Sequence, residues 1–286
     1  MTHIPDTAES GEHGYVIDAG NAAEMARLML QDCLLTKTLG GLVPEQLDLS
    51  QVFRVLDVAC GPGGWLLDLG MQYPHIQGMG IDISQLMIDY ASSQAASQEL
   101  PNVQFRVMDA TGPLDFPNHT FDLVNARLIG FFPPSLWPKL LKELLRITRP
   151  GGTIRLTETE MSVSNSPALE QEHTWFFQSF WKAGQSFSSN GHRLTITAML
   201  APLLRQAGCS NVATRAYGID WSSGTEAHDT LRQNALVGFK LIEPFYLATG
   251  VATQAEMDLI YAQMLTEMQQ PDFAAVQYYL SAWGQR

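Results

Sequence analysis

Apolar runs and helical patterns alternate along the first 160 residues of this chain, and this order predicts an α/β fold. Residues 52–58 are apolar and rich in β-branched side chains, as in a strand that is buried on both faces. Residues 65–73 have helical spacing and stop before Pro74. Further strands are predicted at residues 78–82, 102–107 and 121–126.

Two helices between these strands are indicated by capping residues and apolar spacing. Ser84 precedes residues 85–98, and its hydroxyl can accept a hydrogen bond from a free amide of the first helical turn. Ser135 stands in the same position before a second helix. The core stripe of that second helix is predicted to be Leu140, Leu141, Leu144 and Leu145.

A glycine-rich turn joins the first strand to the helix that follows it. Gly61, Gly63 and Gly64 permit backbone angles and a close approach that a Cβ would forbid, so a ligand can lie against the main chain. The dinucleotide pattern Gly-x-Gly-x-x-Gly fails because Leu66 occupies its sixth position, and a phosphate-binding loop fails because no lysine is near. Asp57 ends the strand, and its carboxylate suits an ammonium or a sulfonium better than a pyrophosphate.

The segment at residues 56–64, Leu-Asp-Val-Ala-Cys-Gly-Pro-Gly-Gly, resembles the first motif of the class I S-adenosylmethionine (SAM) dependent methyltransferases. Segments similar to the later motifs follow in order at residues 81–84, 103–110, 121–128 and 149–158. The resemblance implies a Rossmann-like seven-stranded sheet whose last strand is antiparallel, with helices on both faces and a helical cap. It also implies SAM as cofactor and S-adenosylhomocysteine as product.

Individual residues acquire expected roles from this resemblance. Asp82 resembles the acid that takes both ribose hydroxyls, and Asp109 the group that meets the adenine amino group. Met87 falls where the family often packs a side chain on the adenine, although an ordinary core methionine is an equal alternative. The expected cofactor-binding residues are Asp57, Ala59, Gly61, Gly63, Asp82, Ile83, Met87, Asp109, Ala110, Asn125, Arg127 and Tyr15.

The fourth strand brings Asn125 and Arg127 to the carboxyl edge of the sheet, where ligands of open α/β folds collect. We expect Arg127 to bridge to a carboxylate of SAM or of the protein. A helical pattern at residues 21–38 resembles the N-terminal helices that cover the cofactor in this family. Tyr15, Arg27 and Gln31 are therefore candidates to touch SAM or substrate, with packing or surface roles as the alternative.

Beyond residue 160 the similarity weakens. Residues 167–184 hold five aromatic side chains, which predicts either core and lid packing or an aromatic substrate chamber. Helices broken at Pro244 and Gly250 separate a sixth strand at 211–217 from a seventh at 273–283. The expected division is an N-terminal helical cover at 1–45, a SAM-binding core at 46–160, and the rest of the sheet with an inserted substrate-binding cap at 161–286.

Methyl transfer from SAM is an in-line displacement, so the protein must mainly align the reacting groups and exclude water. A phenol or alcohol acceptor gains from a general base, for which His173 and His192 in the cap segments are the candidates. Glu158 and Glu160 are alternative bases or polar contacts to substrate. No regular ligand spacing supports a metal site.

Composition narrows the choice of partners. The 286 residues carry 17 Lys and Arg against 29 Asp and Glu, a formal net charge of −12, and no basic cluster, which disfavours nucleic acid. Three widely spaced cysteines indicate a reduced, cytoplasmic location. No apolar run is long enough for a signal or a membrane span, so we expect no membrane partner. A homodimer stays open.

The preferred interpretation is a methyltransferase that acts on a small, largely apolar or aromatic metabolite, on oxygen, in secondary metabolism. Transfer to carbon or nitrogen stays open, because the cofactor half does not report the nucleophile. A SAM-binding protein without methyl transfer, for example a cyclase, is the alternative from another class. A macromolecule as acceptor is not indicated by any feature of the sequence.

Overall fold

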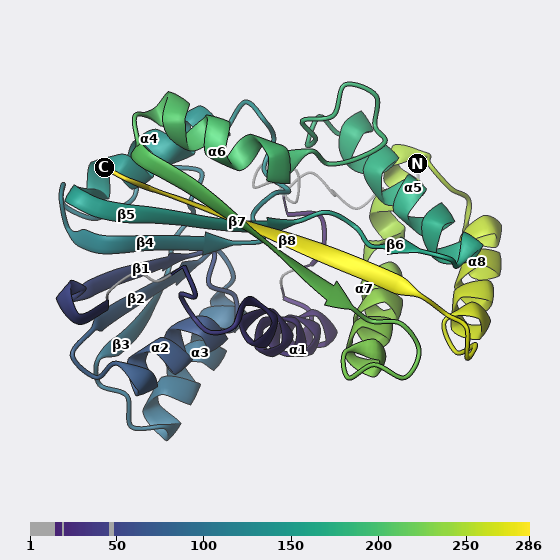
Figure 1. Ribbon diagram of the computed structural model, residues 1–286, viewed down its shortest axis with the longest axis horizontal. Coiled ribbons are helices and arrows are strands. Elements are labelled where there is room, and N and C mark those ends of the chain that lie inside the picture. Colours follow the sequence, from purple (N-terminus) through teal and green to yellow (C-terminus); the bar gives the residue numbers. More distant parts are fainter. Residues whose placement is uncertain (1–14, 19, 46–48) are drawn as a thin grey trace, which may run out of the picture.

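The computed structural model describes residues 15–18, 20–45 and 49–286, so residues 1–14, 19 and 46–48 of the predicted segments lie outside it. In the described residues, the chain forms one sheet with helices on both of its faces (Figure 1). The strands are β1 Arg54–Val58, β2 Gln77–Asp82, β3 Val103–Val107, β4 Phe121–Arg127, β5 Thr148–Thr159, β6 Val163–Ser164, β7 Ser210–Asp220 and β8 Ala275–Gln285.

The sheet has the order β3-β2-β1-β4-β5-β8, and β7 pairs with the other edge of β8. Strands β1 to β5 are parallel, whereas β8 runs antiparallel to both β5 and β7. The two-residue strand β6 extends the edge of β5 along β8. The predicted Rossmann-like sheet with an antiparallel last strand is therefore confirmed, with β6 as an addition.

Helices α2 and α3 lie on one face of the sheet and α4 and α6 on the other (Figure 1). Helices α5, α7 and α8 pack against one another beyond the carboxyl ends of the parallel strands, and we call this group the cap. The helices are α1 Ala22–Leu39, α2 Gly64–Gln72, α3 Gln85–Ser97, α4 Trp137–Ile147, α5 Pro167–Lys182, α6 Ile196–Ala207, α7 His228–Thr249 and α8 Gln254–Glu267; a single 3₁₀ turn spans Leu49–Gln51.

Local chemistry explains most of the helix ends. Asn21 caps α1 by accepting a hydrogen bond from the Ala23 amide, and Gly40 ends that helix with φ +84°. Ser84 caps α3 as predicted, by accepting from the Met87 amide. Thr253 begins α8 with a complete capping box.

Two details of the helices differ from the predictions. Ser135 does not cap α4, because that helix begins one residue later than predicted, at Trp137, and its N-cap residue is Leu136, which forms no side-chain cap. Pro244 does not break α7, which continues to Gly250. A proline inside a helix costs about 3 kcal/mol, and the packing of α7 against α1, α5 and α8 opposes that cost.

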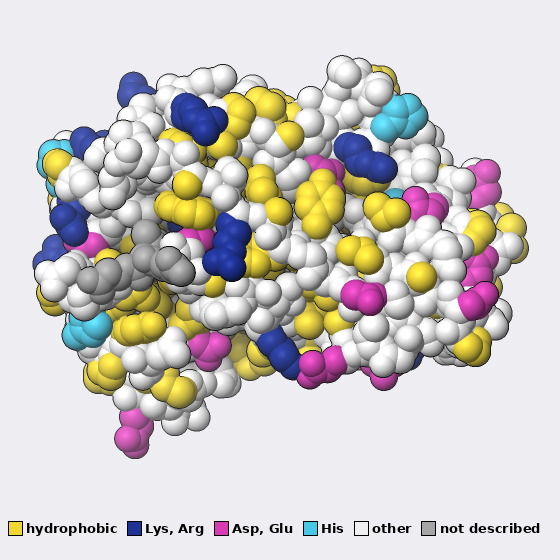
Figure 2. Space-filling view, in the orientation of Figure 1, with side chains coloured by type: hydrophobic (Ala, Val, Ile, Leu, Met, Phe, Trp, Pro, Cys, Tyr) yellow, Lys and Arg dark blue, Asp and Glu magenta, His cyan; other side chains and the backbone are white. Residues whose placement is uncertain are grey.

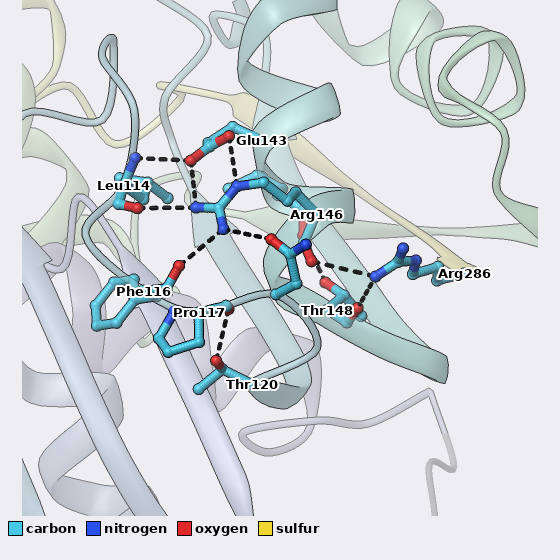
Figure 3. Close-up of polar contacts among 10 residues, drawn as sticks. Leu114, Phe116, Pro117, Thr120, Glu143, Arg146, Thr148 and Arg286 are labelled. Carbon is cyan, nitrogen blue, oxygen red and sulfur yellow. Dashed lines mark hydrogen bonds and ion pairs between the residues drawn. The ribbon is translucent and has the colours of Figure 1, made fainter.

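Arg146 on α4 fixes the loop that follows β3 (Figure 3). Its Nη1 donates to the Phe116 carbonyl and its Nη2 to the Leu114 carbonyl, both at 2.8 Å. Glu143 pairs with this guanidinium at 2.6 Å and also accepts from the Leu114 amide at 2.8 Å. Because this loop leaves the carboxyl edge of the sheet, the cluster helps to place residues 109–110 there.

The surface offers two further observations. On the face in Figure 2, Lys and Arg side chains are scattered and do not gather into one basic patch. Among the helices of the described residues, none combines the length and the apolar character that crossing a membrane requires.

Candidate functional site

A cavity of about 360 Å³ opens at the carboxyl ends of the parallel strands. One part of its wall, which we call the sheet half, comes from the loops after β1, β2 and β3 and from α1. The other part, the cap half, comes from α5, α7 and the segments that follow β4 and β5. The two halves form one continuous cavity, with a volume typical of small-molecule sites.

The glycine loop after β1 is held in an unusual conformation by its neighbours. Ala59 and Gly61 both have φ +53°, an angle that costs a non-glycine residue such as Ala59 about 1–3 kcal/mol. Asp82 clamps the loop, since its Oδ2 accepts from the Gly61 amide at 2.9 Å. Its Oδ1 accepts from the Ser84 amide, also at 2.9 Å. The carboxylate of Asp82 thus lies in the cavity wall beside the main chain of the loop.

Burial raises the pKa of Asp82, although its hydrogen bonds with the backbone amides of Ser84 and Gly61 lower it. A carboxylate with two oxygens can accept about four hydrogen bonds in all. These two amides occupy one position on each oxygen, so the side chain can also accept from hydroxyl donors in the cavity.

Asp57 lies deeper in the same wall and is only 2% exposed. Its Oδ1 accepts from Asn125 Nδ2 at 2.7 Å, and Asn125 Oδ1 accepts from Arg155 Nη1 at 2.9 Å. Arg155 in turn forms two hydrogen bonds of 3.0 Å with the Glu45 carboxylate. The amide nitrogen and the amide oxygen of Asn125 are therefore both engaged by protein groups, and Asn125 lies behind Asp57, outside the cavity lining.

Burial raises the pKa of Asp57 to about 6, while the nearby Arg127 charge and the Asn125 amide lower it. If Asp57 binds a cationic ammonium, the attraction is complete above pH 7 and is lost as the pH falls through about 6, because the carboxyl becomes neutral. We expect SAM affinity to fall by up to about 10-fold between pH 7.5 and pH 5, because about a tenth of the Asp57 side chains stay ionised at pH 5 when the pKa is about 6. Titration calorimetry with wild type and Asp57→Asn measures this.

The Asp57→Asn protein should show weak binding at both pH values, because its side chain does not titrate. An equally steep pH dependence in Asp57→Asn would assign the titration to another group. The matched control is Asp89→Asn, since Asp89 lies exposed on α3 and hydrogen-bonds Gln85.

Helix α1 covers the sheet half of the cavity. Its Asp32 accepts a 2.6 Å hydrogen bond from Arg127 Nη2, and the Arg127 guanidinium lies 5.6 Å from the ring centre of Trp65. A Cβ on Gly64 would come within 2.1 Å of Asp32, so Gly64 lets α1 approach the first turn of α2. Within the described part of the chain, the buried Nε of Arg127 has no hydrogen-bond partner. The predicted bridge of Arg127 to a protein carboxylate is thus found at Asp32.

A second cluster on α1 reaches the cap. Tyr15 donates to Glu24, and the guanidinium of Arg27 forms two hydrogen bonds of 2.6 and 2.7 Å with the same carboxylate. Arg27 also donates to Asn234 of α7 at 2.9 Å and to Gln31 at 3.4 Å. Tyr15, Arg27 and Gln31 line the cavity, whereas the fully buried Glu24 stands behind them.

The cap half is largely aromatic and apolar. Phe176 and Phe180 of α5 face the cavity, with ring centres 4.7 Å apart. Trp175 and Phe177 are buried away from the cavity, and Trp181 is 45% exposed. The aromatic run of α5 therefore serves both of the predicted purposes, core packing and a chamber wall. Other apolar lining residues are Met161, Leu169, Leu194, Trp221, Leu231, Phe239 and Ile242.

Three ionisable side chains interrupt this apolar wall. Burial raises the pKa of Glu158 to about 8 and that of Glu172 to about 7. Glu158 accepts from the Ile129 amide at 2.7 Å, and Glu172 accepts from the Tyr246 hydroxyl. Burial lowers the pKa of His173 to about 3, so its imidazole is neutral near pH 7.

The two candidate histidines have different surroundings. His173 is 4% exposed and lines the cavity, with its Nε2 3.7 Å from the nearer oxygen of Glu172. His192 is exposed on the loop between α5 and α6, outside the cavity lining. Glu160 also lies outside it and accepts from the Leu194 amide at 2.9 Å. The described residues contain no group of three or more His, Cys, Asp or Glu suited to a metal ion.

Most residues predicted to bind the cofactor meet at this one cavity. Gly63 is an exception, because its missing Cβ makes room for Phe105 and Ala91 and not for a ligand. Asn125 is another, as described above. Those that line the cavity are Tyr15, Asp57, Ala59, Gly61, Asp82, Ile83, Met87, Asp109, Ala110 and Arg127.

Sequence reasoning missed several residues of the site. Glu24 could have been found, since it precedes Arg27 by three residues on the same helix face. Glu172, Trp221, Asn234 and Phe239 reach the cavity from cap segments that follow no recognisable motif.

Comparison with known proteins identifies a methyltransferase domain. A family model described as a methyltransferase domain matches residues 55–152. An uncharacterized methyltransferase of Schizosaccharomyces pombe is 31% identical over 134 residues, which are 44% of this chain and 47% of that protein. The chain thus spans about half the length of this curated relative.

Two further proteins are similar over more of their length. A demethylmenaquinone methyltransferase of Staphylococcus saprophyticus is 28% identical over 61% of this chain and 78% of its own. The crystal structure of the [4+2]-cyclase SpnF has a TM-score of 0.52 and 21% identity, and covers 93% of this chain and 96% of its own. The motif order and the strand order agree with this match, and residues 55–152 form a methyltransferase domain similar to those of the class I SAM-dependent methyltransferases.

Proposed function

We propose that this protein transfers a methyl group from SAM to a small, largely apolar or aromatic metabolite, on oxygen. The observation that carries the proposal is the continuity of the cavity. Its sheet half has the carboxylates and the open loop that suit SAM, and its cap half is an aromatic chamber that suits such an acceptor. The demethylmenaquinone methyltransferase is a relative whose name also indicates a small organic acceptor.

The residues of the sheet half fit SAM in charge and in hydrogen bonding. We assign the ribose hydroxyls to Asp82 and the amino group to Asp57, since both are carboxylates in the cavity wall. Met87 would pack on the adenine, near Asp109, which Thr111 holds by two 2.8 Å hydrogen bonds. The partnerless Nε of Arg127 is a donor for the SAM carboxylate. When bound, SAM supplies an electrophilic methyl group on a sulfonium.

The rest of the mechanism is positioning. Closure by α1 and the cap keeps water from the methyl group, and the aromatic wall orients the acceptor, which together can lower the barrier by several kcal/mol. His173 and Glu172 would share the proton of an acceptor hydroxyl, because the two side chains are adjacent and the imidazole of His173 is neutral near pH 7 and can accept a proton. His192 has no part in this assignment, since it lies outside the cavity.

The experiment is incubation of the purified protein with SAM and with metabolite extract of its host, followed by mass spectrometry. We expect S-adenosylhomocysteine to form together with a species that is heavier by one methyl group. The position of the new methyl group, read from fragmentation, separates oxygen from carbon or nitrogen acceptors.

A cyclase-like function is the second candidate, because SpnF shares this fold over nearly its whole length. It predicts tight SAM binding without S-adenosylhomocysteine formation and a product of unchanged mass. If SAM stays intact in host extracts in which the protein forms a product of unchanged mass, the proposed methyl transfer is overturned.

A further inference from the structure

The cap half of the cavity contains a buried polar atom without a protein partner. Within the described residues, Nδ1 of His173 is buried and has no hydrogen-bond partner. Buried polar atoms in folded proteins are nearly always hydrogen-bonded, so an exception in a cavity wall calls for a ligand atom. The other such nitrogen in this lining, Nε of Arg127, belongs to the sheet half.

The groups around the imidazole of His173 determine whether its Nδ1 donates or accepts a hydrogen bond. Two acceptors act on the ring: the Glu172 oxygen that lies 3.7 Å from Nε2, and the backbone of Ser162, whose hydrogen bond raises the pKa of His173. Since Nδ1 has no partner among the described residues, both favour the tautomer with its hydrogen on Nε2. The other oxygen of Glu172 is taken by the Tyr246 hydroxyl, which keeps the carboxyl in place. A neutral imidazole protonated at Nε2 presents a lone pair at Nδ1. The missing partner is therefore a hydrogen-bond donor.

The charges around the cap half disfavour an anionic partner. The cationic side chains of the lining, among the described residues, are those of Arg27 and Arg127. Arg27 already makes four hydrogen bonds, to Glu24, Asn234 and Gln31, and Arg127 lies in the sheet half, paired with Asp32. Arg193 is the further cation whose charge acts on His173, but it is exposed, lies over the ring of Phe177 and is not part of this lining. Glu158 and Glu172 add carboxyl groups to the same wall, so a carboxylate here would be buried without a counter-charge in the lining.

We propose that the acceptor is an uncharged aromatic or polycyclic molecule that donates a hydroxyl hydrogen bond to His173 Nδ1, and that acidic analogues are rejected. His173 is thus the residue that selects for the hydroxyl. The proposal rests on the proposed function for the identity of the bound molecule as the methyl acceptor, but the recognition itself can be measured without any turnover.

The test uses three probes with one ring system: 2-naphthol, 2-naphthoate and 2-methylnaphthalene. Each is titrated into the full-length protein saturated with S-adenosylhomocysteine, at pH 8, and binding is followed by ligand-observed NMR. We expect 2-naphthol to bind about 3- to 10-fold more tightly than 2-methylnaphthalene, as for one neutral hydrogen bond. We expect 2-naphthoate to bind at least about 10-fold more weakly than 2-naphthol, because its charge is left unpaired.

His173→Phe keeps the aromatic wall and removes Nδ1. In this variant 2-naphthol and 2-methylnaphthalene should bind equally, while the affinity for SAM stays at the wild-type value. His192→Phe is the matched control, in which the preference for 2-naphthol should persist. Equal binding of 2-naphthoate and 2-naphthol, an unchanged preference in His173→Phe, or no binding of any probe would each overturn the proposal.

The outcomes also separate this inference from the proposed function. A hydroxyl preference that depends on His173, in a protein that never forms S-adenosylhomocysteine, would reject methyl transfer and keep the recognition. Formation of a methylated product by a protein without this hydroxyl preference would keep methyl transfer and reject the recognition by His173.

Discussion

Replacing Asp82 with alanine is expected to weaken SAM binding by at least about 10²-fold. If this carboxylate takes both ribose hydroxyls, the variant loses two hydrogen bonds to a charged group, each worth about 1.5–3 kcal/mol. The variant also releases the amides of Gly61 and Ser84, which Asp82 accepts from at 2.9 Å, so the glycine loop loses its clamp. Titration calorimetry with SAM measures the loss.

Asp82→Asn separates the two effects. Its amide oxygen can still accept one of the two backbone hydrogen bonds, so the fold should survive while the ribose contacts weaken. Asp89→Ala, on the exposed face of α3, is the control and should bind SAM like wild type. Wild-type affinity in both Asp82 variants would show that the ribose is bound elsewhere.

Replacing Arg155 with methionine is expected to lower the free energy of unfolding by about 3–5 kcal/mol. Arg155 and Glu45 form an ion pair whose side chains are both fully buried. Removing one member leaves the other as an uncompensated buried charge. The same change frees Asn125, which Arg155 Nη1 orients toward Asp57, so SAM affinity should fall as well. Urea denaturation and SAM titration measure the two effects.

The double variant Arg155→Met with Glu45→Met should recover most of the lost stability, because apolar side chains of similar volume can replace a buried ion pair. Arg106→Met is the control on an exposed pair with Asp115, where at most about 1 kcal/mol is expected. A double variant as unstable as the single one would mean that packing, and not the unpaired charge, causes the loss.

Parts of the site were predictable because their determinants are local. Asp57 and Asp82 end consecutive parallel strands, so both had to reach the same sheet edge. Side-chain direction was harder to predict. Asn125 pairs with Asp57 in the sheet register, and its side chain turns to Asp57 and Arg155 and not to the cavity. Gly63 belongs to the same pattern as Gly61, but it makes room for packing.

The cap could be predicted only in outline. His173 precedes an aromatic run and His192 follows Ser-Ser-Asn-Gly, but only the fold shows that α5 buries the first against the cavity while a surface loop exposes the second. Glu172 and Asn234 come from helices whose phase depends on packing against α1 and α8, which no local pattern records. Pro244 within α7 is a further case in which tertiary packing outweighs the low helix propensity of a residue.

The position of β8 has a consequence for how the protein is synthesised. This strand follows all the other elements in the chain, yet it lies between β5 and β7. While the polypeptide emerges from the ribosome, β7 has no neighbour to pair with among the described strands. The cap helices α7 and α8, which lie between β7 and β8 in the sequence, are then not yet joined to the sheet at their C-terminal end. The nascent chain must therefore leave the edge of β5 exposed until β8 arrives, an interval in which a molecular chaperone would protect it.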